Sequence, residues 1–352
     1  MKKFITISVL LIALVLVCLP RFNQNDISIL KNLSGKGEYS YKNNEGFAIY
    51  NTSPDVYEYI LITEYFRGKS TYNYLNYPYT YRPGIPYLAS ILPFDPLTSL
   101  NLINLLFLLI SLIFIIKTAK LLGSPFGLQV LSCILYIFSF PVFYYGTIGM
   151  VDAPLVTLLF IGLYLLLKEK WLLLSFLFLI GSLIKETIII LLPVIFIYMV
   201  IKNRLNWKYY VWFSIYIILY LVFSYFAHHI IPIENKFKWM PSFKTVLENI
   251  SRIRTYISFS LAFGIPGILS LFAISYYFKY KLKQNMLICM TLFTGLIFSF
   301  LLFLFSIISA YSDGRFIWTS YPFTIPLSIY FINLKKPKFI SKFLLFFNES
   351  KT

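Results

Sequence analysis

Ten apolar runs constrain this chain more than any other feature of its sequence. They cover residues 4–20, 99–116, 125–145, 150–167, 171–184, 187–201, 209–232, 256–278, 285–309 and 317–334. A helix of about 20 apolar residues is long enough to cross the hydrocarbon core of a bilayer. Hydrophobic residues make up 59% of the chain and charged residues only 13%, whereas soluble domains have about 25% charged residues. The sequence therefore predicts an all-α polytopic membrane protein with about ten transmembrane helices, and it excludes a soluble enzyme and a nucleic-acid-binding module.

The excess of basic residues indicates how these spans are oriented. The chain has 31 Lys and Arg residues against 14 Asp and Glu residues, a net charge of +17. With the N-terminus inside, the inner loops hold more than half of the basic residues and only two acidic ones, Glu169 and Glu349. Such an excess of Lys and Arg is typical of cytoplasmic loops. We therefore expect both termini in the cytoplasm. A composition heavy in Lys, Ile, Phe and Asn favours a bacterial inner (plasma) membrane.

Two of the apolar runs have an alternative interpretation. Residues 4–20, which follow Lys2 and Lys3, have the pattern of a signal peptide, but the absence of a small-residue cleavage site favours an uncleaved first span. Residues 171–201 are interrupted only around Lys185-Glu186 and form either one long span or a hairpin of two short ones. A single span would flip every later loop and move basic residues to the outer side. The positive-inside rule therefore favours the hairpin.

Residues 1–338 are predicted to form a single transmembrane domain, whose first outer loop, residues 21–98, is the longest polar region. Within it, residues 54–67 and 83–92 are expected to form short interfacial helices, because each begins with a proline suited to a first helical turn and is rich in Tyr, Leu and Ile. The aromatic and basic residues of the segment 339–352 predict a short amphipathic tail on the cytoplasmic surface.

Two motifs of this outer loop carry candidate functional residues. In the first, Asp55, Glu58 and Tyr59 are three and four positions apart, so a helix places them on one face. Asp55 has a plainer role available as a cap of that helix. In the second, Tyr81-Arg82-Pro83, the tyrosine suits either a sugar-stacking wall or the aromatic belt of the membrane. The guanidinium of Arg82 suits a phosphate.

Three further motifs fall at the outer ends of later spans. Asp152-Ala153-Pro154 begins the fourth span, where Asp152 either caps the helix or takes part in chemistry. Lys185 lies at the tip of the predicted hairpin and needs an anionic partner, either the adjacent Glu186 or a phosphate brought by a lipid. Arg315, in Asp313-Gly314-Arg315, lies in the last outer turn. Ionisable groups at such depths are functional candidates because they are costly near hydrocarbon.

These motifs and their order resemble the GT-C class of integral-membrane glycosyltransferases, which includes the protein O-mannosyltransferases and the bacterial aminoarabinose transferases. The resemblance covers roughly residues 1–200 and, more loosely, Arg315-Phe316 and Pro322. It rests on four motifs: Asp55-Val56-Tyr57-Glu58-Tyr59, Tyr81-Arg82-Pro83-Gly84-Ile85-Pro86-Tyr87, Asp152-Ala153-Pro154, and Lys185-Glu186 after a short apolar run. The chain departs from the class at Asp55-Val56, where many members have two adjacent acids.

The resemblance implies an inverting hexosyl- or pentosyltransferase that moves a sugar from a polyprenyl-phosphate-linked donor to an acceptor hydroxyl on the extracytoplasmic face. Its setting would be the synthesis of a cell-envelope glycan or glycolipid. The chemistry needs a base for the acceptor proton and cations for the departing phosphate. The implied roles are a catalytic base at Asp55, orientation of acceptor or sugar by Glu58, Tyr59 and Asp152, and donor-phosphate binding by Lys185, Arg315 and Arg82.

We expect no cofactor, because a lipid-phosphate sugar carries its own leaving group; a divalent metal is possible in such chemistry but is not indicated. The adjacent His228-His229 does not have the spacing of helical metal ligands and suits the membrane interface. The expected partners are the lipid-linked donor, a glycan, lipid or protein acceptor, and the bilayer, but no nucleic acid. The alternatives are a lipid-linked sugar flippase, polysaccharide polymerase or other multi-span transporter, and a non-catalytic scaffold.

Overall fold

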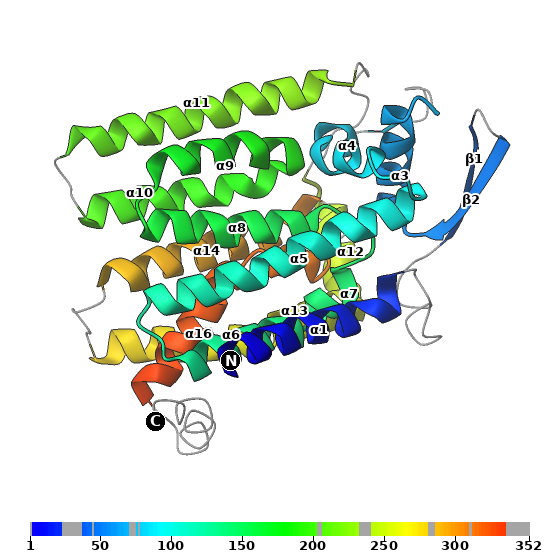
Figure 1. The fold of residues 1–352 in the computed structure, drawn as a ribbon. Helices are drawn as coiled ribbons and strands as arrows, with labels where there is room; N and C mark the ends of the chain where they lie inside the picture. The colour runs from blue at the N-terminus through cyan, green and yellow to red at the C-terminus, as the bar shows by residue number, and fades with distance from the viewer. Residues whose placement is uncertain are drawn as a thin grey trace.

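The computed structural model describes residues 2–22, 37–43, 46–69, 75–76, 78–202, 206–231, 241–280, 286–309 and 312–335. Within these ranges, ten helices follow the ten apolar runs in order: α1 (Lys2–Phe22), α5 (Pro96–Leu121), α6 (Phe126–Ile137), α8 (Asp152–Leu167), α9 (Trp171–Ile184), α10 (Leu191–Lys202), α11 (Trp207–His229), α13 (Ile253–Tyr280), α14 (Met286–Ser309) and α16 (Tyr321–Lys335). Their axes run roughly along one direction, with α11 and α1 at opposite edges of the bundle (Figure 1).

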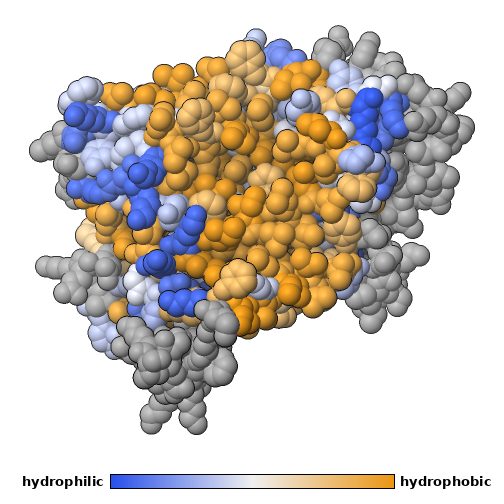
Figure 2. Space-filling model, viewed as in Figure 1, coloured by the Kyte–Doolittle hydropathy of each residue, from blue (hydrophilic) through white to orange (hydrophobic). Residues whose placement is uncertain are grey.

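The face of the bundle seen in Figure 2 is a broad hydrophobic band with hydrophilic residues towards both ends. Among the described residues, α1, α5, α11, α13 and α14 are each long and apolar enough to cross a membrane, whereas α6, α8 and α9 are shorter apolar helices. The prediction of an all-α polytopic membrane protein is therefore confirmed. The shorter helices lie against the long ones, and α8 is buried over most of its length between α5, α9 and α16.

Close approach of these helices depends on small residues. At Gly162 of α8, an added Cβ would lie 2.4 Å from Leu191 Cδ1, so a larger residue would require the side chain of Leu191, in the first turn of α10, to move. Such contacts between backbones and side chains are typical of helix packing inside membranes, where van der Waals contact replaces the hydrophobic effect as the driving force.

The stretch 171–201 is two helices that return to the same end of the bundle. Glu169, just before α9, forms an ion pair with Lys202, the last residue of α10, and accepts a hydrogen bond from Tyr198 at 3.0 Å. Trp171 and Tyr198 lie next to each other, with ring centroids 6.4 Å apart. The two ends of the stretch therefore meet, and the tip at Lys185-Glu186 lies at the other end, as the charge distribution predicts. A short 3₁₀ segment, η3 (Glu186–Ile190), joins the helices.

Shorter elements gather at the end of the bundle that holds this tip. They are β1 (Gly37–Asn43), β2 (Gly46–Thr52), α3 (Pro54–Phe66), η2 (Tyr79–Tyr81), α4 (Gly84–Ser90), α7 (Phe140–Tyr145), α12 (Phe243–Ser251) and α15 (Arg315–Trp318). The helices predicted at 54–67 and 83–92 are confirmed as α3 and α4, and Pro54 occupies the first turn of α3. The antiparallel pair β1–β2, with Gly37 opposite Thr52, was not predicted. The predicted tail, residues 339–352, lies outside the described residues.

Candidate active site

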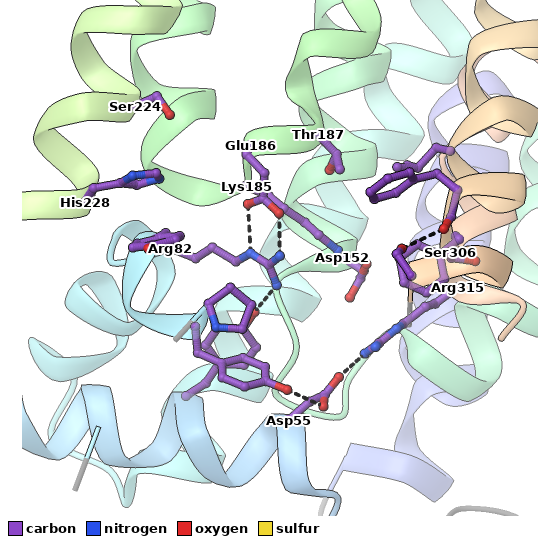
Figure 3. A pocket seen from close by; sticks show the side chains of 18 of the residues that line it. Asp55, Arg82, Asp152, Lys185, Glu186, Thr187, Ser224, His228, Ser306 and Arg315 are labelled. Atoms are coloured by element: carbon purple, nitrogen blue, oxygen red, sulfur yellow. Dashed lines mark hydrogen bonds and ion pairs between the residues drawn. The ribbon is translucent and has the colours of Figure 1, made fainter. Parts of the chain in front are cut away.

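A cavity of about 430 Å³ opens among these short elements and the helix ends beside them. Its wall includes six charged side chains: Asp55, Arg82, Asp152, Lys185, Glu186 and Arg315. They come from α3, from the segment between η2 and α4, from the start of α8, from the hairpin tip and from α15, so segments far apart in the sequence converge here (Figure 3). The sequence predicted seven site residues. All of them except Glu58 line this cavity.

Asp55 forms an ion pair with Arg315, which lies 260 positions away along the chain. The other carboxylate oxygen of Asp55 accepts a hydrogen bond of 2.7 Å from the hydroxyl of Tyr79. Burial raises the pKa of Asp55, but the charge of Arg315 and these hydrogen bonds outweigh it and hold the pKa below its usual value. Although Asp55 lies in the first turn of α3, its carboxylate is directed at these two partners in the cavity.

Lys185 forms its ion pair with Asp152, across 2.6 Å, and both side chains are almost completely buried. The backbone of Lys185 is extended, which ends α9 and turns the ammonium group towards the first turn of α8. The adjacent Glu186, which the sequence offered as one possible partner, instead contacts Arg82. Asp152 therefore neutralises the buried lysine, a role that the sequence did not predict for it.

Arg82 is held by three hydrogen bonds. Its Nε and Nη2 atoms donate to the two carboxylate oxygens of Glu186, at 2.9 Å for Nε, and its Nη1 atom donates to the hydroxyl of Tyr59 at 3.0 Å. Burial raises the pKa of Glu186, but the charge and hydrogen bonds of Arg82 prevail and lower it to about 2. This fork-to-carboxylate pair fastens the first outer loop to the hairpin tip.

Arg315 begins α15, directly after a turn that is hydrogen-bonded to α13. The backbone N–H of Gly314 donates to Ser258 Oγ at 2.7 Å, and that hydroxyl also contacts the hydroxyl of Tyr145 at 3.1 Å. Asp313 Oδ1 accepts the backbone N–H of Arg315 at 2.9 Å and lies 3.6 Å from its Nε atom. Arg315 is therefore oriented by two carboxylates, Asp313 just before it in the chain and Asp55 across the cavity.

Glu58 is the predicted site residue that does not line the cavity. It accepts a hydrogen bond of 2.9 Å from Asn76 Nδ2, and burial raises its pKa. Glu58 lies one helical turn from Asp55 on α3.

The cavity has a neutral side that the sequence did not point to. Tyr220, Ser224 and His228 of α11 line it at spacings of four residues, which places them on one face of that helix. The ring of His228 stacks on Tyr81, with centroids 3.6 Å apart. Polar residues at every fourth position of an otherwise apolar span would have predicted a polar face on this helix. It was overlooked because a histidine at the end of a span also suits the membrane interface.

An apolar groove adjoins the cavity. It has a volume of about 700 Å³ and is lined by residues of α10, α11 and α14 and the hairpin tip. Leu302 and Phe305 of α14 line both the groove and the charged cavity, so the two spaces are neighbours. Within the described residues, no three His, Cys, Asp or Glu side chains come together in a way that would hold a metal ion.

A multi-span helical bundle with a charged cavity at one end is the arrangement expected of the GT-C class, and comparison with known families supports that assignment. Residues 85–228 match the family model described as dolichyl-phosphate-mannose-protein mannosyltransferase, a GT-C type glycosyltransferase domain. The resemblance stated from the motifs is therefore confirmed over this segment, which matches a glycosyltransferase domain of the GT-C type. The match contains Asp152, Lys185 and Glu186, while Asp55 and Arg315 lie outside it. No curated protein and no solved structure matches the chain.

Proposed function

We propose that the protein transfers a sugar from a polyprenyl-phosphate-linked donor to an acceptor hydroxyl at the extracytoplasmic membrane face, in the synthesis of a cell-envelope glycan or glycolipid. The observation that supports this most is the convergence of one carboxylate, Asp55, and two cations, Lys185 and Arg315, in one cavity. A glycosyl transfer from a phosphate needs this combination, because a proton is taken from the acceptor while negative charge develops on the leaving phosphate.

In the proposed reaction, Asp55 accepts the proton of the acceptor hydroxyl as the acceptor oxygen attacks the anomeric carbon of the donor sugar. The bond between that carbon and the phosphate oxygen breaks, and its electron pair leaves with the lipid phosphate. Lys185 and Arg315 stabilise this phosphate. Attack from the face opposite the leaving group inverts the anomeric centre. The transferred sugar is a hexose or a pentose, and the acceptor is a glycan, lipid or protein.

The other predicted residues are proposed to position these groups. Asp152 orients Lys185 through the buried ion pair, and Arg82 holds the hairpin tip against η2 through Glu186. Tyr59 supports Arg82 from α3, and Glu58 supports the helix turn that carries Asp55. Arg82 is also proposed to contact the donor phosphate. For this contact the guanidinium has to give up part of its hydrogen bonding to Glu186 or Tyr59.

The apolar groove is the proposed site of the polyprenyl chain. It lies among α10, α11 and α14, all of which carry hydrophobic residues on the surface of the bundle, and it shares two residues with the charged cavity. A lipid-linked donor seated there places its phosphate beside the cations and its chain towards the bilayer. The lysine-bearing helix ends lie at the opposite end of the bundle, which supports cytoplasmic termini. The composition rich in Lys, Ile, Phe and Asn supports a bacterial inner membrane.

The proposal is tested with purified protein and a labelled polyprenyl-phosphate sugar. Turnover of the donor is expected for the wild-type protein and is expected to be lost in Asp55→Asn, which keeps size and shape but cannot take the proton. Asp95→Asn is the matched control, because Asp95 caps α5 through the backbone N–H of Thr98, and asparagine caps equally well. Full turnover in Asp55→Asn would remove Asp55 from its role. Donor that crosses the membrane unchanged would favour a transporter instead.

A further inference from the structure

Arg315 is shared between two carboxylates. Its Nη1 atom pairs with Asp55 Oδ2, while its Nε atom and its backbone N–H both face Asp313 Oδ1, at 3.6 and 2.9 Å. The side chain of Arg315 is 15% exposed and that of Asp55 is 24% exposed. The guanidinium can therefore release Asp55 and remain held by Asp313.

The other two ion pairs of the cavity are held in different ways, the first by burial and the second by the number of its hydrogen bonds, since Glu186 itself is 39% exposed. Lys185 and Asp152 have side chains only 7% and 5% exposed, and separating them would leave a buried charge without its partner. Arg82 uses Nε, Nη1 and Nη2 in hydrogen bonds to Glu186 and Tyr59. Lys185 differs from Arg82 in having three ammonium protons, of which one goes to Asp152, so it is able to bind an anion without leaving its partner.

The pairing with Arg315 makes Asp55 a poor base in the protein alone. A carboxylate that is neutralised by a guanidinium and holds the hydroxyl proton of Tyr79 has little tendency to take another proton. General base catalysis is most effective when the base binds a proton readily near the working pH. The pairing with Arg315 therefore holds the proposed base in a form that is unsuited to accepting a proton.

Building on the proposed function, we infer that the donor phosphate and Asp55 compete for Arg315, so that binding of the donor releases the base. The phosphate accepts the hydrogen bond that Arg315 now gives to Asp55, while Lys185 supplies a second one. Asp55 then keeps its contact with Tyr79 but loses its cation. A partly buried carboxylate without a cation binds a proton more readily. No covalent bond changes in this exchange, and its consequence is an order of events: the base becomes competent only after the donor has bound.

The competition makes a prediction that runs against the usual effect of removing a catalytic group. Asp55→Asn should bind polyprenyl phosphate more tightly than the wild-type protein, by roughly fivefold or more, because the released Arg315 no longer has to leave a carboxylate. Tyr79→Phe is the matched control. It removes the other partner of Asp55 without releasing Arg315, so its affinity should stay within about twofold of wild type. Arg315→Ala should bind more weakly than wild type.

The measurement is an equilibrium titration of each detergent-purified variant with long-chain polyprenyl phosphate, and with the matching polyprenol as a ligand without phosphate. Circular dichroism and gel filtration show whether each variant is folded. If the wild-type protein does not distinguish polyprenyl phosphate from polyprenol, the proposed donor site is wrong and the competition falls with it. If the wild-type protein does distinguish them but Asp55→Asn binds no more tightly, the donor site stands and the competition is refuted. Tighter binding in Asp55→Asn but not in Tyr79→Phe supports it.

Discussion

Lys185 and Glu186 show at the scale of single residues what the sequence could and could not reveal. Both were recognisable as costly charges at a hairpin tip. Their partners were not, because Lys185 has an extended backbone, and neighbouring side chains on an extended backbone point in opposite directions. Lys185 therefore reaches Asp152 of α8, and Glu186 reaches Arg82. The sequence suggests an ion pair between Lys185 and Glu186, and the extended backbone at Lys185 prevents it.

The buried pair of Lys185 and Asp152 permits a test by paired substitution. Asp152→Asn should destabilise the protein by about 3–5 kcal/mol, because it leaves a buried ammonium group without its counter-charge. Adding Lys185→Met removes that charge and should recover most of the loss. Thermal unfolding in detergent measures both effects, and the double variant should remain without transfer activity. Equal stability of the single and the double variant would show that the lysine is not buried as charged.

The ion pair of Glu186 and Arg82 should make the thermal stability of the protein depend on pH in the acidic range. Since the charge of Arg82 lowers the pKa of Glu186 to about 2, the pair contributes fully above the unfolded-state value of about 4.3. Its contribution is lost as the pH falls from that value towards the folded one. The wild-type protein should therefore lose more thermal stability than Glu186→Gln between about pH 5 and 2, and the two should converge towards the lower value. Parallel curves would argue against the ion pair.

At the scale of whole elements, periodic hydrophobicity and charge predicted more. The ten apolar runs reappear as helices in order, and the hairpin of α9 and α10 follows from the distribution of lysines alone. The strand pair was missed, although Tyr39 and Tyr41 alternate with polar residues in β1. In a chain dominated by long apolar runs, a short alternating segment rich in tyrosine is equally typical of a membrane-interface loop.

Cysteine labelling of intact membrane vesicles tests the hairpin. Glu169→Cys and Lys202→Cys should react from the same side of the membrane, opposite to Tyr87→Cys on the exposed part of α4, because the two ends of the hairpin are joined by their ion pair. The three native cysteines, Cys18, Cys133 and Cys289, are buried and should give little background. Labelling of positions 169 and 202 from opposite sides would mean that this stretch crosses the membrane once.

The loop that carries Arg315 should be sensitive to a single added methyl group. A Cβ at Gly314 would lie 2.4 Å from the backbone oxygen of Ser258 and 2.6 Å from Ala262 Cβ. Gly314→Ala should therefore shift the loop, reduce donor turnover and cost about 1–3 kcal/mol of stability. Gly123→Ala is the control, because it strains a residue with positive φ but meets no atom within 4 Å. It should lose stability and keep its turnover per folded molecule.

For the whole molecule, the positive-inside rule predicted which motifs share a membrane side, and the order of the motifs predicted the GT-C class. Neither predicts which side chains touch. Asp55 and Arg315 are 260 positions apart, and their meeting depends on where the bundle places α15, which packs against α13 and α14, relative to α3. Such packing has no signature in hydrophobic periodicity, because apolar helices in a membrane differ little in composition. The cavity was therefore predictable as a set of residues but not as a set of ion pairs.

The central claim is that a proton acceptor and two phosphate-binding cations from distant parts of the chain form one site at the membrane surface. An experimental structure of the protein with polyprenyl phosphate tests it most directly. We expect the phosphate within hydrogen-bonding distance of Lys185 Nζ and the Arg315 guanidinium, and the prenyl chain in the groove among α10, α11 and α14. A phosphate bound out of reach of both cations, or at the lysine-bearing end of the bundle, would contradict the account.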